Sequence, residues 1–292
     1  MKSSKMLRKI MMMTLAVMLV FAMSLPVAAQ DYFTTTDGSY IQGTAPTYQN
    51  QTIYVDMVIE SRTISGDYIY ETIENVPLTA GGTAESFYVL DVLLAVQNIG
   101  DYTFNDASGN PLDANDSYFY SVTDEDTSAT YGPTSQYAWD GWVFRIDGQF
   151  PLESAGWGAS IATAYVTNGD TINLYHDDVS SSTACADFAK ITSVNVSGST
   201  MTVNVKASWQ YYGPAPNYDW TLADFTNYSG VTVNVCTTTG TVLRSGTTDA
   251  SGNATINVQG LRTGNCIVQV QRTTFASGLI QNTTDEVLYV LQ

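Results

Sequence analysis

YAWDGWVFRIDGQFPLESAGWGASIATAYVTNGDTINLYHDD, residues 137–178, is the stretch that decides the fold of this chain. It contains three of the five tryptophans and the only histidine. Within it WVFRI, residues 142–146, alternates side chains in the period of a β-strand, and Asp147-Gly148 is typical of a tight turn. Residues 162–167 and 171–176 predict two more strands, joined by a turn at residues 168–170.

The sequence before this stretch predicts a hairpin and a helix. Residues 52–60 alternate apolar and polar side chains, and residues 67–76 predict a second strand that Pro77 closes. Residues 86–99 carry apolar side chains at three- and four-residue steps, with Gly100 placed to end a helix. Such a wide apolar stripe indicates a helix that lies across a sheet.

Residues 101–136 are polar and rich in turn-forming residues, with one short strand expected at residues 118–122. The acids of this segment do not keep the alternating spacing of a calcium-binding loop. We therefore interpret it as a solvated acidic loop.

The order of these elements resembles the transcobalamin-like C-terminal domain of exported bacterial proteins, over about residues 51–178. The positions that match the family pattern are Gly141, Trp142, Phe144, Ile146, Asp147, Gly148, Gly169, Asp170 and Ile172. Asp147 stands where the family usually has Asn, a change that a turn tolerates. The resemblance implies a β-grasp-like α+β domain wrapped on the helix, and a non-catalytic domain that binds a ligand such as cobalamin or another corrinoid.

The loop between the strands is the best location for a ligand-binding surface. Its candidate ligand-binding residues are Tyr137, Trp139, Phe150 and Trp157, since aromatic side chains beside glycines can cover a flat molecule with little loss of entropy. Trp142 and Gly148 are interpreted as residues that hold the fold. His176, beside two acids at a strand end, is interpreted as solvated, and we expect no metal site.

Catalysis has little support in the sequence. A triad of the Ser-His-Asp or Cys-His type would need His176, whose neighbours show no nucleophile-elbow pattern. Although two carboxylates could meet in space, nothing selects one pair among the 28 acids. We expect a protein that is not an enzyme.

Residues 1–29 have the features of a secretory signal: a basic head, an apolar run at residues 10–23 and a small-residue exit ending at Ala29. The apolar run is shorter than the ~20 residues of a comfortable membrane span, so no membrane insertion is expected after cleavage. Loss of four of the 11 basic residues would leave 7 minus 28, or −21 charges. Such acidity disfavours nucleic acid as a partner and suits a secreted or cell-surface protein.

The remaining sequence predicts further organisation. Residues 30–50 are expected to be a flexible lead-in and residues 179–190 a linker. Residues 191–292 contain short strands between turns, which predicts a β-sandwich. The part around residues 231–270 resembles carboxypeptidase-regulatory-like and immunoglobulin-like modules, which implies a spacer at a cell surface.

Two of the three cysteines, Cys236 and Cys266, lie on strands that could be neighbours, so a disulfide is one alternative. The alternation places Cys236 opposite in phase to Val233 and Val235, whereas Cys266 is in phase with Val268. A bond between them therefore needs the two cysteines on one face, or a bulge.

Two hypotheses about function remain. The first is a secreted binding protein that holds a small molecule, with a corrinoid as the leading candidate, through its first domain. The second is a structural or adhesive surface component that contacts only other surface proteins.

Overall fold

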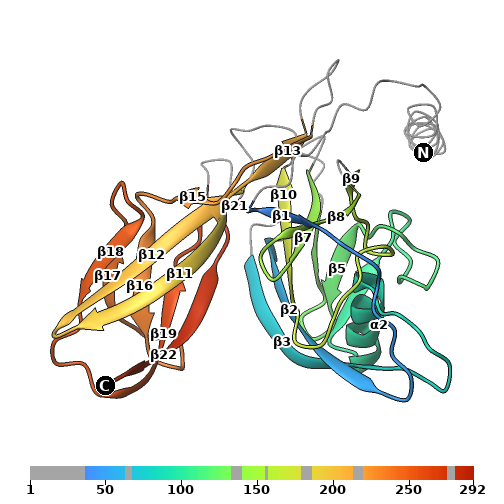
Figure 1. The fold of residues 1–292 in the computed structure, drawn as a ribbon, viewed down its shortest axis with the longest axis horizontal. Helices are drawn as coiled ribbons and strands as arrows, with labels where there is room; N and C mark the ends of the chain where they lie inside the picture. Colours follow the sequence, from blue (N-terminus) through green and yellow to red (C-terminus); the bar gives the residue numbers. More distant parts are fainter. Residues whose placement is uncertain are drawn as a thin grey trace.

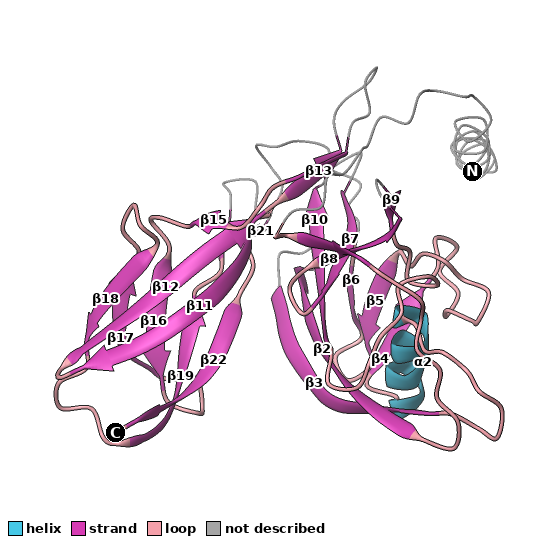
Figure 2. Cartoon of the chain, viewed as in Figure 1, coloured by secondary structure: helices cyan, strands magenta, loops and turns pink. Residues whose placement is uncertain are grey.

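The computed structural model describes residues 37–62, 68–132, 140–154, 157–178, 186–212, 220–274 and 280–292. The predicted signal segment lies outside these residues. The chain is mainly β, with several sheets and, in the described ranges, one helix (Figure 2). Two units stand side by side, residues 37–178 (the first unit) and residues 186–292 (the second unit), as Figure 1 shows. No helix within the described ranges is both long and apolar enough to cross a membrane.

The first unit is built on a four-stranded mixed sheet of order β3-β2-β10-β7. Its strands are β2 (Thr52–Arg62), β3 (Tyr68–Thr79), β7 (Asp140–Ile146) and β10 (Thr171–Asp178). The central strands β2 and β10 are parallel, while both outer pairs are antiparallel. The predicted hairpin and both central strands are thus confirmed. However, β3 runs past Pro77, because an edge strand tolerates a residue that donates no hydrogen bond.

Helix α2 (Val89–Ile99) packs on one face of this sheet (Figure 1). Four residues of β2 that the alternation placed on one face are all buried in its core: Ile53, Val55, Met57 and Ile59. Leu93 of the helix is fully buried in the same core. Gly100 adopts φ 99°, and its N–H caps the carbonyl of Val96, as the sequence indicated.

The segment predicted as a strand at residues 162–167 is instead a turn followed by irregular chain. It covers the start of α2: Val89 N–H donates to the Ala164 carbonyl at 2.9 Å, and Leu90 N–H to the Ile161 carbonyl at 2.8 Å. The first N–H groups of a helix lack partners within the helix. This segment supplies those partners, which explains why its apolar pattern does not form a strand.

The acidic segment is also more structured than expected. It forms a sheet of order β4-β5-β6, from β4 (Tyr102–Asn105), β5 (Ser121–Asp124) and β6 (Ala129–Tyr131). Phe104 and Val122 are fully buried against the helix side of the first unit. Alternation over three or four residues is too short to be recognised among so many polar side chains.

The predicted lead-in is ordered from residue 37. A further sheet of order β1-β8-β9 is formed by β1 (Ser39–Ile41), β8 (Phe150–Ser154) and β9 (Trp157–Gly158). β1 runs parallel to β8, and Phe150 N–H donates to the Gly38 carbonyl at 2.8 Å. Pairing with β8 therefore fixes a segment whose sequence shows no period.

The second unit consists of two facing sheets around a second apolar core, and the short strands between turns predicted there are present. One sheet contains β11 (Phe188–Ser197), β12 (Thr200–Ser208), β15 (Thr226–Asn227) and β18 (Asn253–Asn257). The other has the order β17-β16-β19-β22, from β16 (Thr232–Cys236), β17 (Val242–Thr247), β19 (Gly264–Val270) and β22 (Asp285–Leu291). Two small hairpins complete it: β13 (Gln210–Tyr212) with β14 (Trp220–Leu222), and β20 (Thr273–Thr274) with β21 (Ile280–Asn282).

The face of the first sheet that turns away from the helix meets the second unit. β11 begins at Phe188, inside the predicted linker, and Phe188 packs with Val143 and Tyr175 in a third apolar cluster. Gly148 has φ 78°, and a Cβ there would lie 3.3 Å from both Phe188 Cε1 and Lys190 Nζ. The predicted turn residue is thus also a contact between the units, and we call this region the junction.

Arg145 crosses the junction and is completely buried. Its guanidinium donates to Tyr175 Oη at 3.2 Å and to the carbonyls of Gly38 and Gly148 at 3.3 and 3.4 Å. It also donates to Ser208 Oγ of the second unit at 3.2 Å. Four bonds to four segments make Arg145 the polar centre of the junction.

Candidate functional site

The four candidate ligand-binding residues do not form a described surface. Tyr137 and Trp139 lie outside the described residues. The backbone of Trp157 belongs to β9, whereas its side chain is not described. Phe150 is only 8% exposed.

Phe150 is buried because β8 places it in the cluster at the junction. It packs there with Val143, Leu152, Tyr175 and Phe188. The expectation of an exposed ring at this position is therefore corrected. The sequence could not indicate this, since the cover comes from β11, which follows more than 30 residues later.

The described residues do bring other aromatic side chains together, at the end of the sheet where β7 starts and β10 finishes. We call Tyr118, Phe119, Tyr120, Trp142 and His176 the aromatic surface. Phe119 and Trp142 have ring centroids 5.2 Å apart, and Trp142 and His176 have centroids 5.6 Å apart. Tyr118 and Tyr120 flank Phe119 in the sequence, and their side chains are 73% and 48% exposed.

The local sequence explains this arrangement. Trp142 on β7 and His176 on β10 are directly opposite each other in the antiparallel pair, so their side chains share one face. Residues 117–120 precede β5, and Phe119 points inward against Phe104 as well as Trp142, which leaves Tyr118 and Tyr120 outward. The alternation in SYFYSV, residues 117–122, was the available signal for this surface.

Trp142 also presents a chemical feature that a ligand could use. Its indole Nε1 is buried and has no hydrogen-bond partner among the described residues. An indole N–H is a donor only, and burial without an acceptor costs free energy. A ligand acceptor that reached this position would remove that cost.

His176 is 2% exposed, so the expectation of a solvated histidine is corrected. Its ring lies against the indole of Trp142 at an interplanar angle of 52°. Among the described residues, no group of three or more His, Cys, Asp or Glu side chains could hold a metal ion.

Cys236 and Cys266 are both buried and unbonded to each other. The register pairs Cys236 with Ile267, one residue away from Cys266, in agreement with the opposite phase seen in the sequence. Burial raises the pKa of both thiols, which keeps them protonated and poorly reactive.

An open cavity of about 250 Å³ lies on the second unit and is lined by residues such as Val196, Val258, Leu261 and Leu291. None of its lining residues belongs to the aromatic surface or to the predicted ligand-binding set. Its size alone therefore gives no reason to prefer it as the functional site.

No family model matches the chain, and no curated protein matches it either.

Proposed function

We propose that this chain is an exported, non-catalytic binding protein whose first unit presents the aromatic surface to its ligand. The observation that carries the proposal is the pair of exposed tyrosines, Tyr118 and Tyr120, which flank Phe119 in the sequence. Phe119 in turn packs on Trp142, whose Nε1 has no described partner. Aromatic side chains give large contact areas with few rotors to immobilise. Such a surface is therefore better suited to binding a ligand than to catalysis.

A relation to the transcobalamin-like C-terminal domain family is part of this proposal. It is supported by a mixed sheet with a parallel central pair and one helix on one face, which suits a β-grasp-like unit. The two facing sheets of the second unit support an immunoglobulin-like module in the role of a spacer. Secretion or surface location follows from the predicted signal and the acidic composition.

The proposed ligand is a corrinoid, a flat molecule whose faces could lie on the tyrosine rings. The chain has 28 acidic and 11 basic residues. This negative net charge favours a neutral or cationic ligand and disfavours an anionic one. Each stacked ring is expected to contribute about 1 kcal/mol to binding.

Direct binding tests this proposal. Equilibrium dialysis of the full chain against cyanocobalamin and dicyanocobinamide should show a Kd below ~1 mM for at least one of them. The double variant Tyr118→Ala/Tyr120→Ala should weaken binding roughly thirtyfold, since two stacking rings worth about 1 kcal/mol each are removed. Circular dichroism should show that the fold is unchanged, because both side chains are exposed.

Tyr54 supplies the matched control: its side chain is 49% exposed, yet it belongs to β2, away from the aromatic surface. Tyr54→Ala should leave the Kd unchanged. Equal weakening by both substitutions would contradict a site on the aromatic surface. A failure of both corrinoids to bind would reject the proposed ligand.

The second candidate function is a structural or adhesive surface component that makes only protein contacts. The junction favours it, because buried polar and apolar contacts hold the two units in one orientation, as a spacer requires. Recovery of the chain in a polymeric surface layer, with no corrinoid bound, would support this function over the first.

A further inference from the structure

The junction concentrates the cations of the chain. Outside the predicted signal there are seven basic residues, and three of them lie here against aromatic rings. Arg145 lies 4.7 Å from the ring centroid of Phe188, and Arg272 lies 4.3 Å from that of Tyr68. Lys190 Nζ is 6.0 Å from the centroid of Phe225. The contacts between the units are thus built around charged groups.

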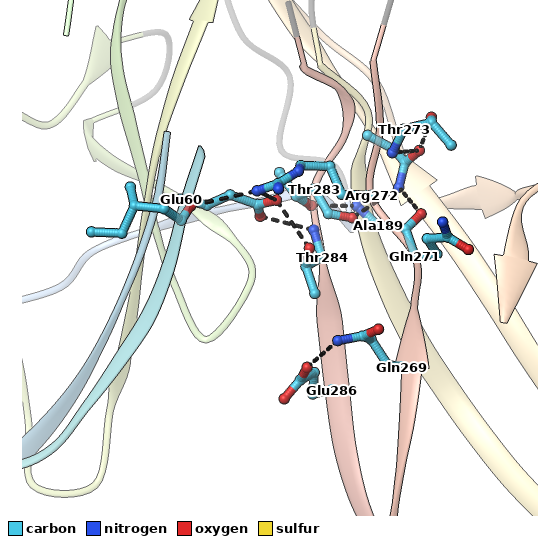
Figure 3. A network of polar contacts seen from close by, with 11 residues as sticks. Glu60, Ala189, Gln269, Gln271, Arg272, Thr273, Thr283, Thr284 and Glu286 are labelled. Carbon is cyan, nitrogen blue, oxygen red and sulfur yellow. Dashed lines mark hydrogen bonds and ion pairs between the residues drawn. The ribbon is translucent and has the colours of Figure 1, made fainter. Parts of the chain in front are cut away.

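One carboxylate accompanies these cations. Glu60 of β2 is 3% exposed and points away from the helix side, into the junction. Its Oε2 accepts the backbone N–H of Thr284 at 2.8 Å, and its Oε1 accepts the Thr284 hydroxyl at 3.0 Å. Arg272 Nη1 lies 3.5 Å from Oε1 (Figure 3). Thr284 and Arg272 both belong to the second unit, so each of these contacts joins the two units.

Other ionisable groups face Glu60 from the strands around it. Tyr70 on β3 and Tyr175 on β10 are its direct cross-strand neighbours. From β22, Asp285 and Glu286 add negative charge that, together with Glu60, raises the pKa of Tyr70 further than burial alone. Arg272, whose side chain is 23% exposed, is thus the cation that offsets the negative charge of these carboxylates.

Burial affects the pKa of the Glu60 carboxyl more than its hydrogen bonds and its ion pair do. It raises the pKa of the Glu60 carboxyl to about 7, although the Thr284 N–H, the Arg272 charge and the Thr284 hydroxyl each lower it. The hydroxyl of Thr284 can either donate or accept, so the same geometry accommodates a protonated carboxyl. Separation of the units would expose Glu60 to water and return the pKa of its carboxyl to the ordinary value.

We propose that the junction is a pH-sensitive joint, in which protonation of Glu60 tightens the docking of the second unit on the first and ionisation loosens it. A docked state that binds a proton more strongly than the undocked state is favoured at low pH. Docking is therefore strongest below the ordinary pKa of Glu60, 4.5, and weakens as the pH rises through about 7. Between about pH 5.5 and 8 the docking equilibrium should change by roughly tenfold or more.

Hydrogen exchange of the full chain, followed by mass spectrometry, tests this joint. The reporter is the peptide that contains the Thr284 N–H, and protection factors correct for the pH dependence of chemical exchange. In the wild type this peptide should lose roughly tenfold of its protection between about pH 5.5 and 8. Peptides from β16 and from α2, inside the two cores, should keep their protection at both pH values.

Glu60→Gln is the decisive variant, because the amide keeps one acceptor and one donor for Thr284 and cannot ionise. Its protection should be the same at both pH values. Arg272→Met provides a second route if that variant folds poorly: loss of the cation should shift the loss of protection to higher pH. Glu286→Gln, a nearby carboxylate that does not bond to Thr284, is the matched control and should behave as wild type. A wild-type junction equally protected at both pH values would overturn the proposal, and so would a pH response retained in Glu60→Gln.

Discussion

Arg145 is the residue on which the junction depends most. A guanidinium has five N–H donors in a fixed planar arrangement. The hydrogen bonds of the Arg145 guanidinium reach β10, the segment before β1, the turn after β7 and the end of β12. Its position at 0% exposure means that any replacement leaves several of these acceptors buried and unsatisfied.

We expect Arg145→Met to lower the free energy of unfolding by about 3 kcal/mol, because several neutral acceptors would stay buried without a donor, at about 1–3 kcal/mol each before the surroundings relax. Arg145→Lys should recover only part of this loss, because an ammonium cannot reproduce the fork geometry. Urea unfolding followed by tryptophan fluorescence measures both.

Arg244→Met is the control for this pair, since Arg244 is exposed and, among the described residues, its guanidinium donates only to the adjacent Leu243 carbonyl. It should change stability by less than about 0.5 kcal/mol. Similar losses for Arg145→Met and Arg244→Met would show that Arg145 is not the centre of the junction.

At the scale of elements, β16 and β19 determine the chemistry of the two buried cysteines. Cys236 faces Ile267 across the ladder, and Cys266 lies in the core between the sheets. In native protein without reductant, neither thiol should react with iodoacetamide, since both are 2% exposed and burial raises the pKa of each.

After unfolding in guanidinium, again without reductant, both cysteines should be alkylated within minutes, and peptide mass spectrometry would identify each. A peptide pair linked through Cys236 and Cys266 would contradict the free thiols of the structure. Cys185 lies outside the described residues, and its peptide is scored separately.

The elements that the sequence predicted well are those with a long, regular period. β2, α2, β7 and β12 each show several apolar side chains in phase, because one face of each packs in the main apolar core of its unit. The segment at residues 162–167 is apolar for a different reason, since it covers the first turn of the helix. Burial alone does not reveal which backbone partner a segment will find.

The candidate site was harder to predict than the fold. Phe150 and Trp142 are both aromatic residues near a turn, yet β11 covers Phe150, whereas Trp142 packs on Phe119, which lies between two exposed tyrosines in the sequence. That difference depends on contacts between segments far apart in the sequence. The contact of Glu60 with the second unit could not be predicted from the sequence for the same reason, because its partner Thr284 follows 224 residues later.

At the scale of the whole molecule, buried carboxyl groups dominate the dependence of stability on pH. Within the described ranges, five buried or half-buried carboxyl groups have a raised pKa, with burial as the largest cause for each: Glu60, Asp91, Asp170, Asp187 and Asp285. For Glu60 the pKa is about 7, and for Asp285 it is about 6. Asp106, which accepts backbone N–H groups at the surface, has a lowered pKa and acts in the opposite direction.

A raised carboxyl pKa means that the folded state binds more protons than the unfolded state, so stability declines as the pH rises through the folded pKa. We therefore expect the midpoint temperature of thermal unfolding to be higher at about pH 5 than at about pH 8. It should fall steadily as the pH rises across this range. Differential scanning calorimetry over this range checks the sign. A midpoint that rises toward pH 8 would show that the surface carboxylates, rather than the buried ones, control stability.

The junction also changes how copies of the molecule act on one another. Because Arg145, Lys190 and Arg272 are engaged with rings inside or beside the junction, few positive charges remain to offset the acids on the outer surface. Neighbouring copies then repel at low ionic strength over a Debye length of about 10 Å or more. Dense packing of this protein at a surface would require dissolved cations between the molecules, so the same side chains that bind the two units together also keep separate molecules apart.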